Sequence, residues 1–454
     1  MTLPTGRISL EQLKGLVQSG AIDAVSVAMT DMQGRLQGKR CSARWFLDEV
    51  VGHGAEACNY LLAVDVDMIT VDGYELTSWE RGYGDFVLRP DFDTLRVLPW
   101  QDRSALVQCD VVWADGRPVA PSPRQVLRAQ LDRLTSRDLV AYVGTELEFI
   151  LFETAYDQAW RAHYRDLKPA NRYNVDYSLL GVAQAGGVLD AIRRGMDGAG
   201  LYSENVKGEC NLGQHEIAFR YAEALETCDN HSVYKAGAKE IAHQHGHALT
   251  FMSKFDEREG NSCHVHLSLR SSSGEPALAG DREHGFSPMM EHFIAGQLSV
   301  LAELTLLLAP NINSYKRYVA GSFAPTTIAW GLDNRTCALR VVGSGQSLRV
   351  ENRVPGGDVN PYMALAGIIA GGLHGIEREL PLEAAFTGNA YTSGRAQVPS
   401  NLAAARDLFA QSAIAKEAFG DEVVAHYVNA ADVELTAFGS AVTDWERTRG
   451  FERL

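Results

Sequence analysis

The N-terminal region alternates polar and apolar positions in patterns typical of one helix followed by two paired strands. Apolar residues at positions 10, 13, 16 and 17 recur at helical spacing behind a capping box of Ser9 and Gln12, so a short helix is predicted there. Residues 24–30 and 35–40 then have the composition of strands joined by a hairpin-length loop. Because short strand-like runs continue, we expect residues 1–118 to form a small N-terminal α+β domain.

A second unit begins at Ser122 and Pro123, which are typical of a helix N-cap followed by proline at the first helical position. Apolar residues at positions 126, 127, 131 and 134 continue this pattern at helical spacing. From Val140 onward, strand-like runs alternate with longer helical ones, and no fixed-period repeat interrupts them. We therefore predict one large domain over residues 119–454.

The composition indicates an ordinary soluble globular protein. Of the 454 residues, 46% are apolar and 22% are charged, and 42 basic against 57 acidic side chains give a net charge of −15. This acidic balance disfavours nucleic acid as a partner and suits a divalent metal or a cationic substrate. The seven cysteines are scattered without a Cys-x-x-Cys pair, so we expect neither disulfides nor a thiolate zinc site. With no leader pattern and no apolar stretch of bilayer length, we expect a cytoplasmic protein that does not contact a membrane.

Two acids mark the first segment with candidate chemistry. Glu146 and Glu148 lie two residues apart within the apolar run 143–150, so a strand would point both carboxylates to one face. Two like charges side by side need a cation. A half-exposed edge strand with solvated acids is an equally weighted alternative for this segment alone.

A second acidic pair is separated by a glycine. Glu209 and Glu216 lie seven residues apart, so an unbroken strand would direct them to opposite faces. Gly213 between them offers a turn that could bring the carboxylates together. The alternative is a loop with one exposed acid at each end.

A third segment combines histidine and serine on one predicted strand face. In residues 263–269 the alternation places His264, His266 and Ser268 on the same side. Imidazole in this position can bind a metal or contact a nucleotide.

Arginines set among apolar residues form the last group, over residues 313–355. Arginine is suited to planar recognition of carboxylate and phosphate, and Glu351 and Arg353 again share one strand face. The chain has no Walker A loop. An acidic metal cluster beside an arginine cluster therefore favours phosphoryl chemistry on a carboxylate.

Taken in this order and at these distances, the segments resemble those of the glutamine synthetase family, from about residue 24 to residue 379. The resemblance implies an α+β protein with a small N-terminal β-grasp-like domain and a large C-terminal catalytic α/β domain containing a curved antiparallel sheet. It also implies ATP as cosubstrate, two divalent cations per subunit (Mg²⁺ or Mn²⁺), and a homo-oligomer that is a dodecamer of two hexameric rings.

The same resemblance implies roles for individual residues. One cation would be held by Glu148, Glu209 and Glu216, and the second by Glu146, His264 and Glu351. Glutamate would be seated by Gly260, Arg317 and Arg353. Charge on the transferred phosphoryl group would be stabilised by the catalytic Arg335 and Arg340, and ATP would be contacted by Glu204, His266, Ser268, Arg340 and Arg349.

Two departures from the family pattern concern the acceptor side of the reaction. Ammonia-using members carry a glutamate in the flap that helps deprotonate ammonium, whereas the corresponding segment here, Gly321–Pro325, has Phe323 in its place. The acidic latch of the N-terminal domain is also missing, and Ala55–Cys58 stands there instead. Both changes resemble the γ-glutamylpolyamine and γ-glutamylethanolamide synthetases. Phe323 and Glu56 are therefore candidate residues of the amine site.

Three functions follow from the sequence. The first is an ATP-dependent ligase that joins the γ-carboxylate of glutamate to a primary amine, either ethanolamine or a polyamine, through γ-glutamyl phosphate. The second is an ammonia-using glutamine synthetase with a relocated base. The third is a non-catalytic scaffold. The sequence disfavours it, because all six metal-ligand positions and all the arginine positions of the family keep their residues.

Overall fold

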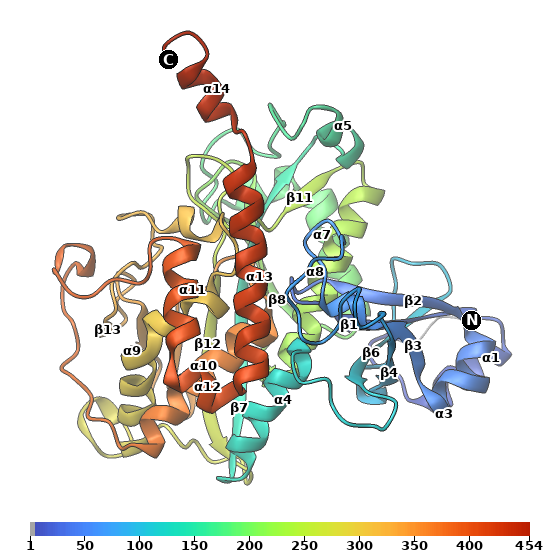
Figure 1. The fold of residues 1–454 in the computed structure, drawn as a ribbon, viewed down its shortest axis with the longest axis horizontal. Helices are drawn as coiled ribbons and strands as arrows, with labels where there is room; N and C mark the ends of the chain where they lie inside the picture. Colours follow the sequence, from blue (N-terminus) through green and yellow to red (C-terminus); the bar gives the residue numbers. More distant parts are fainter. Residues whose placement is uncertain (1–4) are drawn as a thin grey trace.

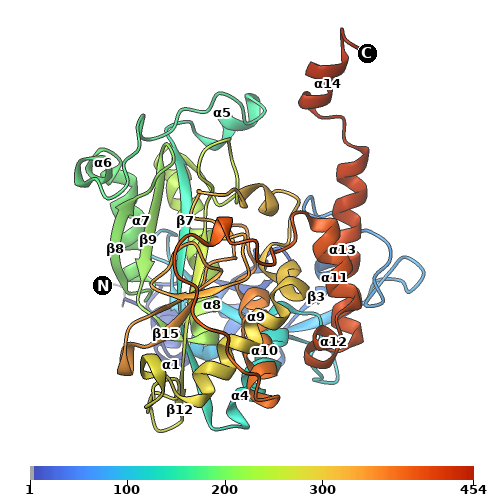
Figure 2. The ribbon, with the colours of Figure 1, turned by 90° about the vertical axis from the view of Figure 1, so that its left-hand side faces the viewer.

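The computed structural model describes residues 5–454 (Figures 1 and 2). Its first helix, α1 (Leu10–Gln18), begins with the expected capping box: the Ser9 hydroxyl accepts from the Gln12 amide at 3.2 Å, and the Ser9 amide donates to the Gln12 side chain at 2.7 Å. The predicted hairpin is also confirmed, because β1 (Ala24–Thr30) pairs antiparallel with β2 (Leu36–Ser42).

The N-terminal region folds around a six-stranded sheet in the order β2-β1-β6-β4-β3, with β5 paired to β6. β1 runs parallel to β6, whereas the other neighbours are antiparallel. The remaining elements here are β3 (Ala55–Cys58), β4 (Asp85–Pro90), β5 (Arg96–Val97), β6 (Ser104–Val112), α2 (Ala43–Trp45) and α3 (Val51–His53).

The remainder of the chain is built on a nine-stranded sheet in the order β13-β14-β15-β12-β7-β9-β8, with β10 and β11 also paired to β7. All pairs are antiparallel except β13 with β14. The strands are β7 (Leu139–Phe152), β8 (Ser203–Gly208), β9 (Gln214–Phe219), β10 (Ala222–Glu223), β11 (Ala248–Thr250), β12 (Cys263–Ser271), β13 (Trp330–Leu332), β14 (Leu339–Val342) and β15 (Arg349–Asn352). The expected α+β class is confirmed.

Helices cover this sheet and extend beyond it (Figures 1 and 2). They are α4 (Pro123–Thr135), α5 (Tyr156–Arg161), α6 (Leu179–Gln184), α7 (Gly186–Gly198), α8 (Ala224–Gln244), α9 (Pro288–Leu308), α10 (Pro361–Glu377), α11 (Leu402–Gln411), α12 (Ala413–Phe419), α13 (Asp421–Ser440) and α14 (Asp444–Gly450). The predicted helix start at Pro123 is confirmed. The short α14 projects away from the body at the end of α13.

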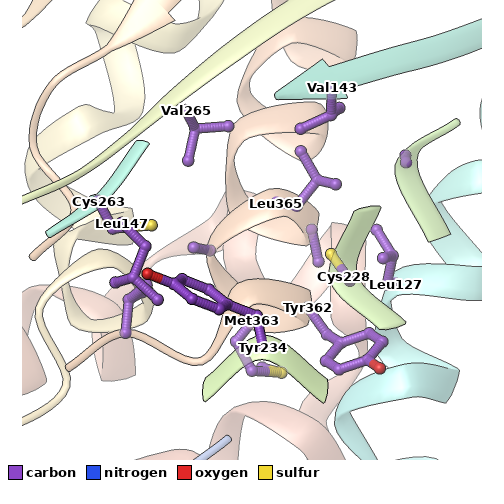
Figure 3. Packing of buried hydrophobic residues seen from close by; sticks show 14 of the residues in the cluster. Leu127, Val143, Leu147, Cys228, Tyr234, Cys263, Val265, Tyr362, Met363 and Leu365 are labelled. Carbon is purple, nitrogen blue, oxygen red and sulfur yellow. The ribbon is translucent and has the colours of Figure 1, made fainter. Parts of the chain in front are cut away.

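The core lies where α10 meets the sheet and α8. Figure 3 shows Tyr362, Met363 and Leu365 of α10 beside Val143 of β7 and Tyr234 of α8, all of which are buried. Within residues 5–454, α9 is the one helix long and apolar enough to cross a bilayer, but 67% of its most apolar window is buried inside the protein. We therefore interpret α9 as a core helix.

A buried ion-pair network joins the N-terminal sheet to the helices. Arg124 of α4 pairs with Asp91 at 2.7 Å and Asp110 at 2.5 Å from the N-terminal region, and with Asp229 of α8 at 2.9 Å. The Arg124 side chain is only 2% exposed, so these carboxylates supply its partners within the protein. The boundary expected after residue 118 falls in the loop between β6 and α4, and the division into two domains stays a prediction.

Candidate active site

Strand β7 places two acids on one face, as its alternation predicts. The register pairs Glu148 directly with Glu216 of β9. Carboxylate oxygens of Glu148, Glu209 and Glu216 lie within 4.8 Å of one another. The Glu148 carboxylate also accepts from the Ser262 amide at 2.6 Å and from Gln214 Nε2 at 3.2 Å, so its orientation is set by neighbouring segments. These three acids form the first carboxylate cluster.

Gly213 makes the turn that assembles this cluster. Glu209 directly follows β8 and Glu216 lies on β9, so the intervening segment has to reverse the chain. Gly213 has φ +71°, and a Cβ there would lie 2.4 Å from the Leu151 carbonyl oxygen. Only glycine tolerates both the left-handed backbone and this close approach. The suggested turn at Gly213 is therefore confirmed, and the alternative of two separated, exposed acids is wrong.

Lys207, which the sequence analysis did not single out, lies beside the first carboxylate cluster. Its Nζ pairs with Glu209 and lies 3.4 Å from Oε2 of Glu216. Burial and the charge of Glu146 raise the pKa of Glu216 to about 8, although Lys207 acts in the opposite direction. The raised pKa shows that the ammonium group of Lys207 does not offset burial and the charges of the neighbouring acids at Glu216.

A second cluster forms where β12 and β15 pair. His264 Nδ1 lies 3.1 Å from Oε2 of Glu146 and 3.5 Å from Oε1 of Glu351. Burial alone would raise the pKa of Glu146, but its hydrogen bonds with His264 and His266 outweigh that and hold the pKa well below its usual range. Glu351 is fully buried, and the charges of His264 and Arg353 lower its pKa despite that burial.

His266 joins the same cluster. Its Nε2 lies 3.0 Å from Oε1 of Glu146, and its Nδ1 lies 3.3 Å from the Arg349 Nε. Ligand atoms of Glu146, His266 and Glu351 all lie within 4.8 Å of one another. His266 therefore links the acids of the second cluster to Arg349, the arginine expected to contact ATP. The expectation that His266 contacts the nucleotide stays a prediction.

Both clusters fit hard divalent cations by the chemistry of their donors. Carboxylate oxygens dominate each set, which suits Mg²⁺ or Mn²⁺, and the imidazoles of the second set are better tolerated by Mn²⁺. Within residues 5–454, the buried Nε2 atom of His264 has no hydrogen-bond partner. Buried polar groups are usually satisfied, so this atom is consistent with a site that gains a ligand.

Two pockets meet at Glu146. The first has a volume of about 390 Å³ and is lined by Glu146, Glu148, Glu209 and Glu216 together with Gly260, His264, Phe323, Arg335, Arg340 and Arg353. The second has a volume of about 490 Å³ and is lined by Glu204, His266, Ser268 and Arg349, together with Tyr142, Tyr221 and Arg270. We call these the acidic pocket and the aromatic pocket. Most of the residues expected to contact ATP thus line the aromatic pocket, while Arg340 lines the acidic one.

Arginines frame the acidic pocket. Arg340 Nη1 donates to Oε2 of Glu351 at 2.8 Å, and Arg353 Nη1 donates to the other oxygen of the same carboxylate. Arg335 lines the pocket as well, near the turn that follows β13. Glu351 therefore fixes the guanidinium groups of Arg340 and Arg353 at the edge of the second cluster.

Arg317 is placed differently from the sequence expectation. Its Nη2 donates to the carbonyl oxygens of Val354 at 2.5 Å and Pro355 at 3.0 Å, and its side chain is buried. It also does not line the acidic pocket. Because buried guanidinium donors must be satisfied, the backbone carbonyls after β15 supply acceptors for Arg317 in this structure. Arg317 Nη2 also donates to the Arg353 carbonyl oxygen at 3.4 Å, and the role of Arg317 in seating glutamate stays a prediction.

The other expected substrate residues divide into two groups. Gly260 lines the acidic pocket, and a Cβ there would lie 2.1 Å from the Ser253 carbonyl oxygen, so no larger residue fits. Phe323 also lines the pocket, with 57% of its surface exposed and φ +56°. Glu56 lies on β3 and does not line either pocket of its own chain. Its role at the amine site stays a prediction, and Glu56 could fill that role only at the site of a neighbouring subunit.

Sequence reasoning missed several pocket residues. Tyr177 and Lys207 line the acidic pocket, and the Lys207 Nζ lies 5.3 Å from the centre of the Tyr177 ring. Tyr142 and Tyr221 meet edge to face at 6.2 Å in the aromatic pocket, where the Arg270 guanidinium lies 5.1 Å from the Tyr142 ring. Tyr142 and Arg270 lie on strands that were already predicted, so extending the alternation along β7 and β12 would have identified them.

Comparison with known proteins agrees with this geometry. The sequence model of the glutamine synthetase catalytic domain matches residues 120–450. The chain is 61% identical over 450 residues to a gamma-glutamylethanolamide synthetase, GlnA4, of Streptomyces coelicolor, covering 99% of this chain and 97% of that protein. It is 34% identical over 444 residues to a glutamate–isopropylamine ligase of a Pseudomonas species, covering 96% and 97%.

A solved structure described as a GmaS/ADP complex superposes with a TM-score of 0.86. It is 28% identical in sequence and covers 97% of this chain and 99% of that chain. The match to the family's catalytic domain extends over most of the chain, and the relatives align with it almost end to end. Together with the two clusters and the arginines that line the two pockets, these findings establish that the chain belongs to the glutamine synthetase family.

Proposed function

We propose that this protein is an ATP-dependent ligase that joins the γ-carboxylate of glutamate to a primary amine through γ-glutamyl phosphate. The observation that carries the proposal is the junction of the acidic and aromatic pockets at Glu146. A nucleotide in the aromatic pocket would direct its terminal phosphate toward a carboxylate in the acidic pocket. The relatives that use ethanolamine or isopropylamine as acceptors support an amine rather than ammonia.

The residues divide the chemical task between them. Glutamate would be held by Arg353 in the pocket that Gly260 also lines, and the charge that develops on the transferred phosphoryl group would be stabilised by Arg335 and Arg340. The two clusters would hold Mg²⁺ or Mn²⁺, which when bound neutralise and align the phosphate and carboxylate oxygens. The side chains of the acidic pocket would exclude water from the acyl phosphate until the amine attacks.

The side chain of Phe323 favours an alkylamine over ammonia as the acceptor. A phenyl ring cannot accept a proton, but it can pack methylene groups, each worth ~0.8 kcal/mol when buried. Ammonium has no such surface and needs a tight acidic cage. We therefore propose ethanolamine or a polyamine as the acceptor class, with Glu56 of a neighbouring subunit as a candidate partner for its distal polar group.

The assembly and its location follow the family as proposals. We propose a dodecamer of two hexameric rings in the cytoplasm, in which the N-terminal domain of one subunit closes the site of the next. Size measurement by light scattering, combined with activity of the separated species, tests this directly. A fully active monomer would refute it.

The function itself is tested by amide formation with glutamate, ATP and one of several amines at equal concentration. Ethanolamine, putrescine, spermidine, isopropylamine and ammonium form the panel. Higher catalytic efficiency with an alkylamine than with ammonium supports the proposal. If ammonium is used best, the protein is a glutamine synthetase, and if no amine yields an amide, it is a non-catalytic member of the family.

A further inference from the structure

The segment around Tyr391 runs alongside the stem of the flap, which we define as Gly321–Pro325. The Ile328 amide donates to the Ala396 carbonyl at 2.9 Å, and the Val398 amide donates to the Thr326 carbonyl at 2.9 Å. Thr327 Oγ1 also donates to the Ala390 carbonyl at 2.9 Å. These bonds join two segments about seventy residues apart and fix the position of Tyr391 relative to the flap.

The Tyr391 hydroxyl reaches the flap itself. It donates to the carbonyl oxygen of Ala324 at 3.2 Å. One residue earlier in the flap, the carbonyl oxygen of Phe323 accepts a hydrogen bond from Arg353 Nη2 at 3.3 Å. Two neighbouring carbonyls of the flap are therefore held by side chains from two different parts of the chain.

The backbone at Phe323, directly before these two carbonyls, is strained. Phe323 has φ +56°, in the left-handed region that bulky side chains rarely occupy. Such conformations persist only where the surroundings hold them, and they gather at functional sites. The Phe323 ring lines the acidic pocket in this conformation. Relaxation of the backbone to negative φ would change the direction of the ring.

We propose that Tyr391 is a positioning residue that holds Phe323 in the conformation in which its ring forms the apolar wall of the amine site. This inference rests on the proposed function, because it assigns the wall to the acceptor of that reaction. Tyr391 acts through Phe323 and does not itself line the acidic pocket. Its hydroxyl hydrogen bond therefore matters for the acceptor step and much less for glutamate or ATP.

A loosened wall has a defined chemical consequence. When the amine is poorly held, water can attack the acyl carbon of γ-glutamyl phosphate, the bond from that carbon to the phosphate oxygen breaks, and glutamate and inorganic phosphate are released. ATP is then consumed without amide formation. The ratio of phosphate released to amide formed thus reports the state of the wall, and a general loss of folded protein does not change it.

The test compares Tyr391→Phe with Tyr156→Phe in the full-length enzyme. The control also removes one hydroxyl that donates to a backbone carbonyl, from Tyr156 to Leu249 at 2.8 Å, but Tyr156 lines neither pocket. For Tyr391→Phe we expect the amine KM to rise roughly five-fold, the change associated with one hydrogen bond. The phosphate-to-amide ratio should rise as well, with unchanged KM values for glutamate and ATP. An amine KM and a ratio equal to those of wild type and Tyr156→Phe would overturn the proposal.

Hydrogen exchange supplies a second measurement that does not depend on catalysis. Peptides covering residues 320–328 should exchange faster in Tyr391→Phe than in wild type or Tyr156→Phe, because the flap loses one of its two anchors. Equal exchange in all three proteins would overturn the anchoring role even if no amine proved to be a substrate. If wild type forms no amide with any amine while the flap still loosens, the proposed function fails and the anchor stands.

Discussion

The ammonium group of Lys207 lies 3.4 Å from Glu216 and also pairs with Glu209, so two acids of the first carboxylate cluster share a cation from the protein itself. That ammonium occupies space beside the oxygens that we propose hold a divalent metal. A cation from the chain and a cation from solution therefore compete for the same negative charge. Lys207 keeps the carboxylates together before metal binds, at some expense in metal affinity.

Replacing Lys207 with methionine should tighten Mn²⁺ binding at this cluster by about ten-fold, because repulsion and competition from the ammonium are removed. Isothermal titration of the nucleotide-free protein with Mn²⁺ measures this. Lys168→Met is the matched control, since it breaks a pair with Glu153 that lies outside both pockets. Unchanged or weaker Mn²⁺ binding in Lys207→Met alone would contradict the competition.

Glu148→Gln keeps the size of the side chain but removes its charge. We expect Mn²⁺ affinity at the first cluster to fall about 10- to 100-fold and ATP turnover to fall with it, while circular dichroism stays that of wild type. Glu153→Gln, one residue beyond the end of β7, serves as a control with no expected effect. Wild-type turnover of Glu148→Gln at limiting Mn²⁺ would show that this acid is not a metal ligand.

Arg353→Ala should raise the KM for glutamate at least ~30-fold, equivalent to about 2 kcal/mol, and raise the KM for ATP much less. The reason is that Arg353 lines the acidic pocket only. Arg270→Ala provides the reciprocal control, because Arg270 lines the aromatic pocket and its loss should raise the KM for ATP more than that for glutamate. Steady-state kinetics with each substrate varied in turn compares the two, and a larger ATP effect in Arg353→Ala would refute the assignment.

His426 should make stability depend on pH. Burial lowers its pKa to about 3, with its ring between Tyr74 and Tyr427 and its Nε2 3.0 Å from the Met32 sulfur. Below about pH 6.5 the unfolded chain binds a proton at this histidine that the folded chain does not, so stability falls as pH drops toward 3. Between pH 7 and pH 5 the loss from this one group is about 2 kcal/mol.

Urea denaturation at pH 7 and pH 5 measures this dependence. His426→Phe removes the titrating group while keeping a ring in the cavity, so its free energy of unfolding should change less between the two pH values by about 2 kcal/mol. His163→Phe is a suitable control because His163 is exposed. Equal pH dependence in His426→Phe and wild type would show that His426 is not the source.

Local patterns in the sequence were sufficient to predict the strands that carry the clusters. Alternation along β7 and β12 placed Glu146 with Glu148 and His264 with His266, because side-chain direction in a strand follows directly from position. Gly213 identified the turn for a similar reason, since its backbone conformation excludes other residues. These are short-range constraints that each segment imposes on itself.

Contacts between distant segments could not be predicted in this way. The Arg317 guanidinium turns toward the carbonyls after β15, and nothing within its own segment indicates that the backbone there needs donors. Tyr391 likewise lies far along the chain from the flap carbonyl that it contacts. Both contacts depend on how the loops pack once the sheet has formed. The periodicity of apolar and polar residues does not indicate this packing.

Strand β7 fixes the spacing between the two clusters of the site. Glu146 and Glu148 stand two residues apart on one unbroken strand, so about 6.6–6.8 Å of backbone separates the two carboxylate clusters. Hydrogen bonds to β9 and β12 on either side prevent that spacing from stretching. The flap, in contrast, is held by two side chains. Changes in the flap can therefore alter which amine is accepted while the distance across which phosphate is transferred stays the same.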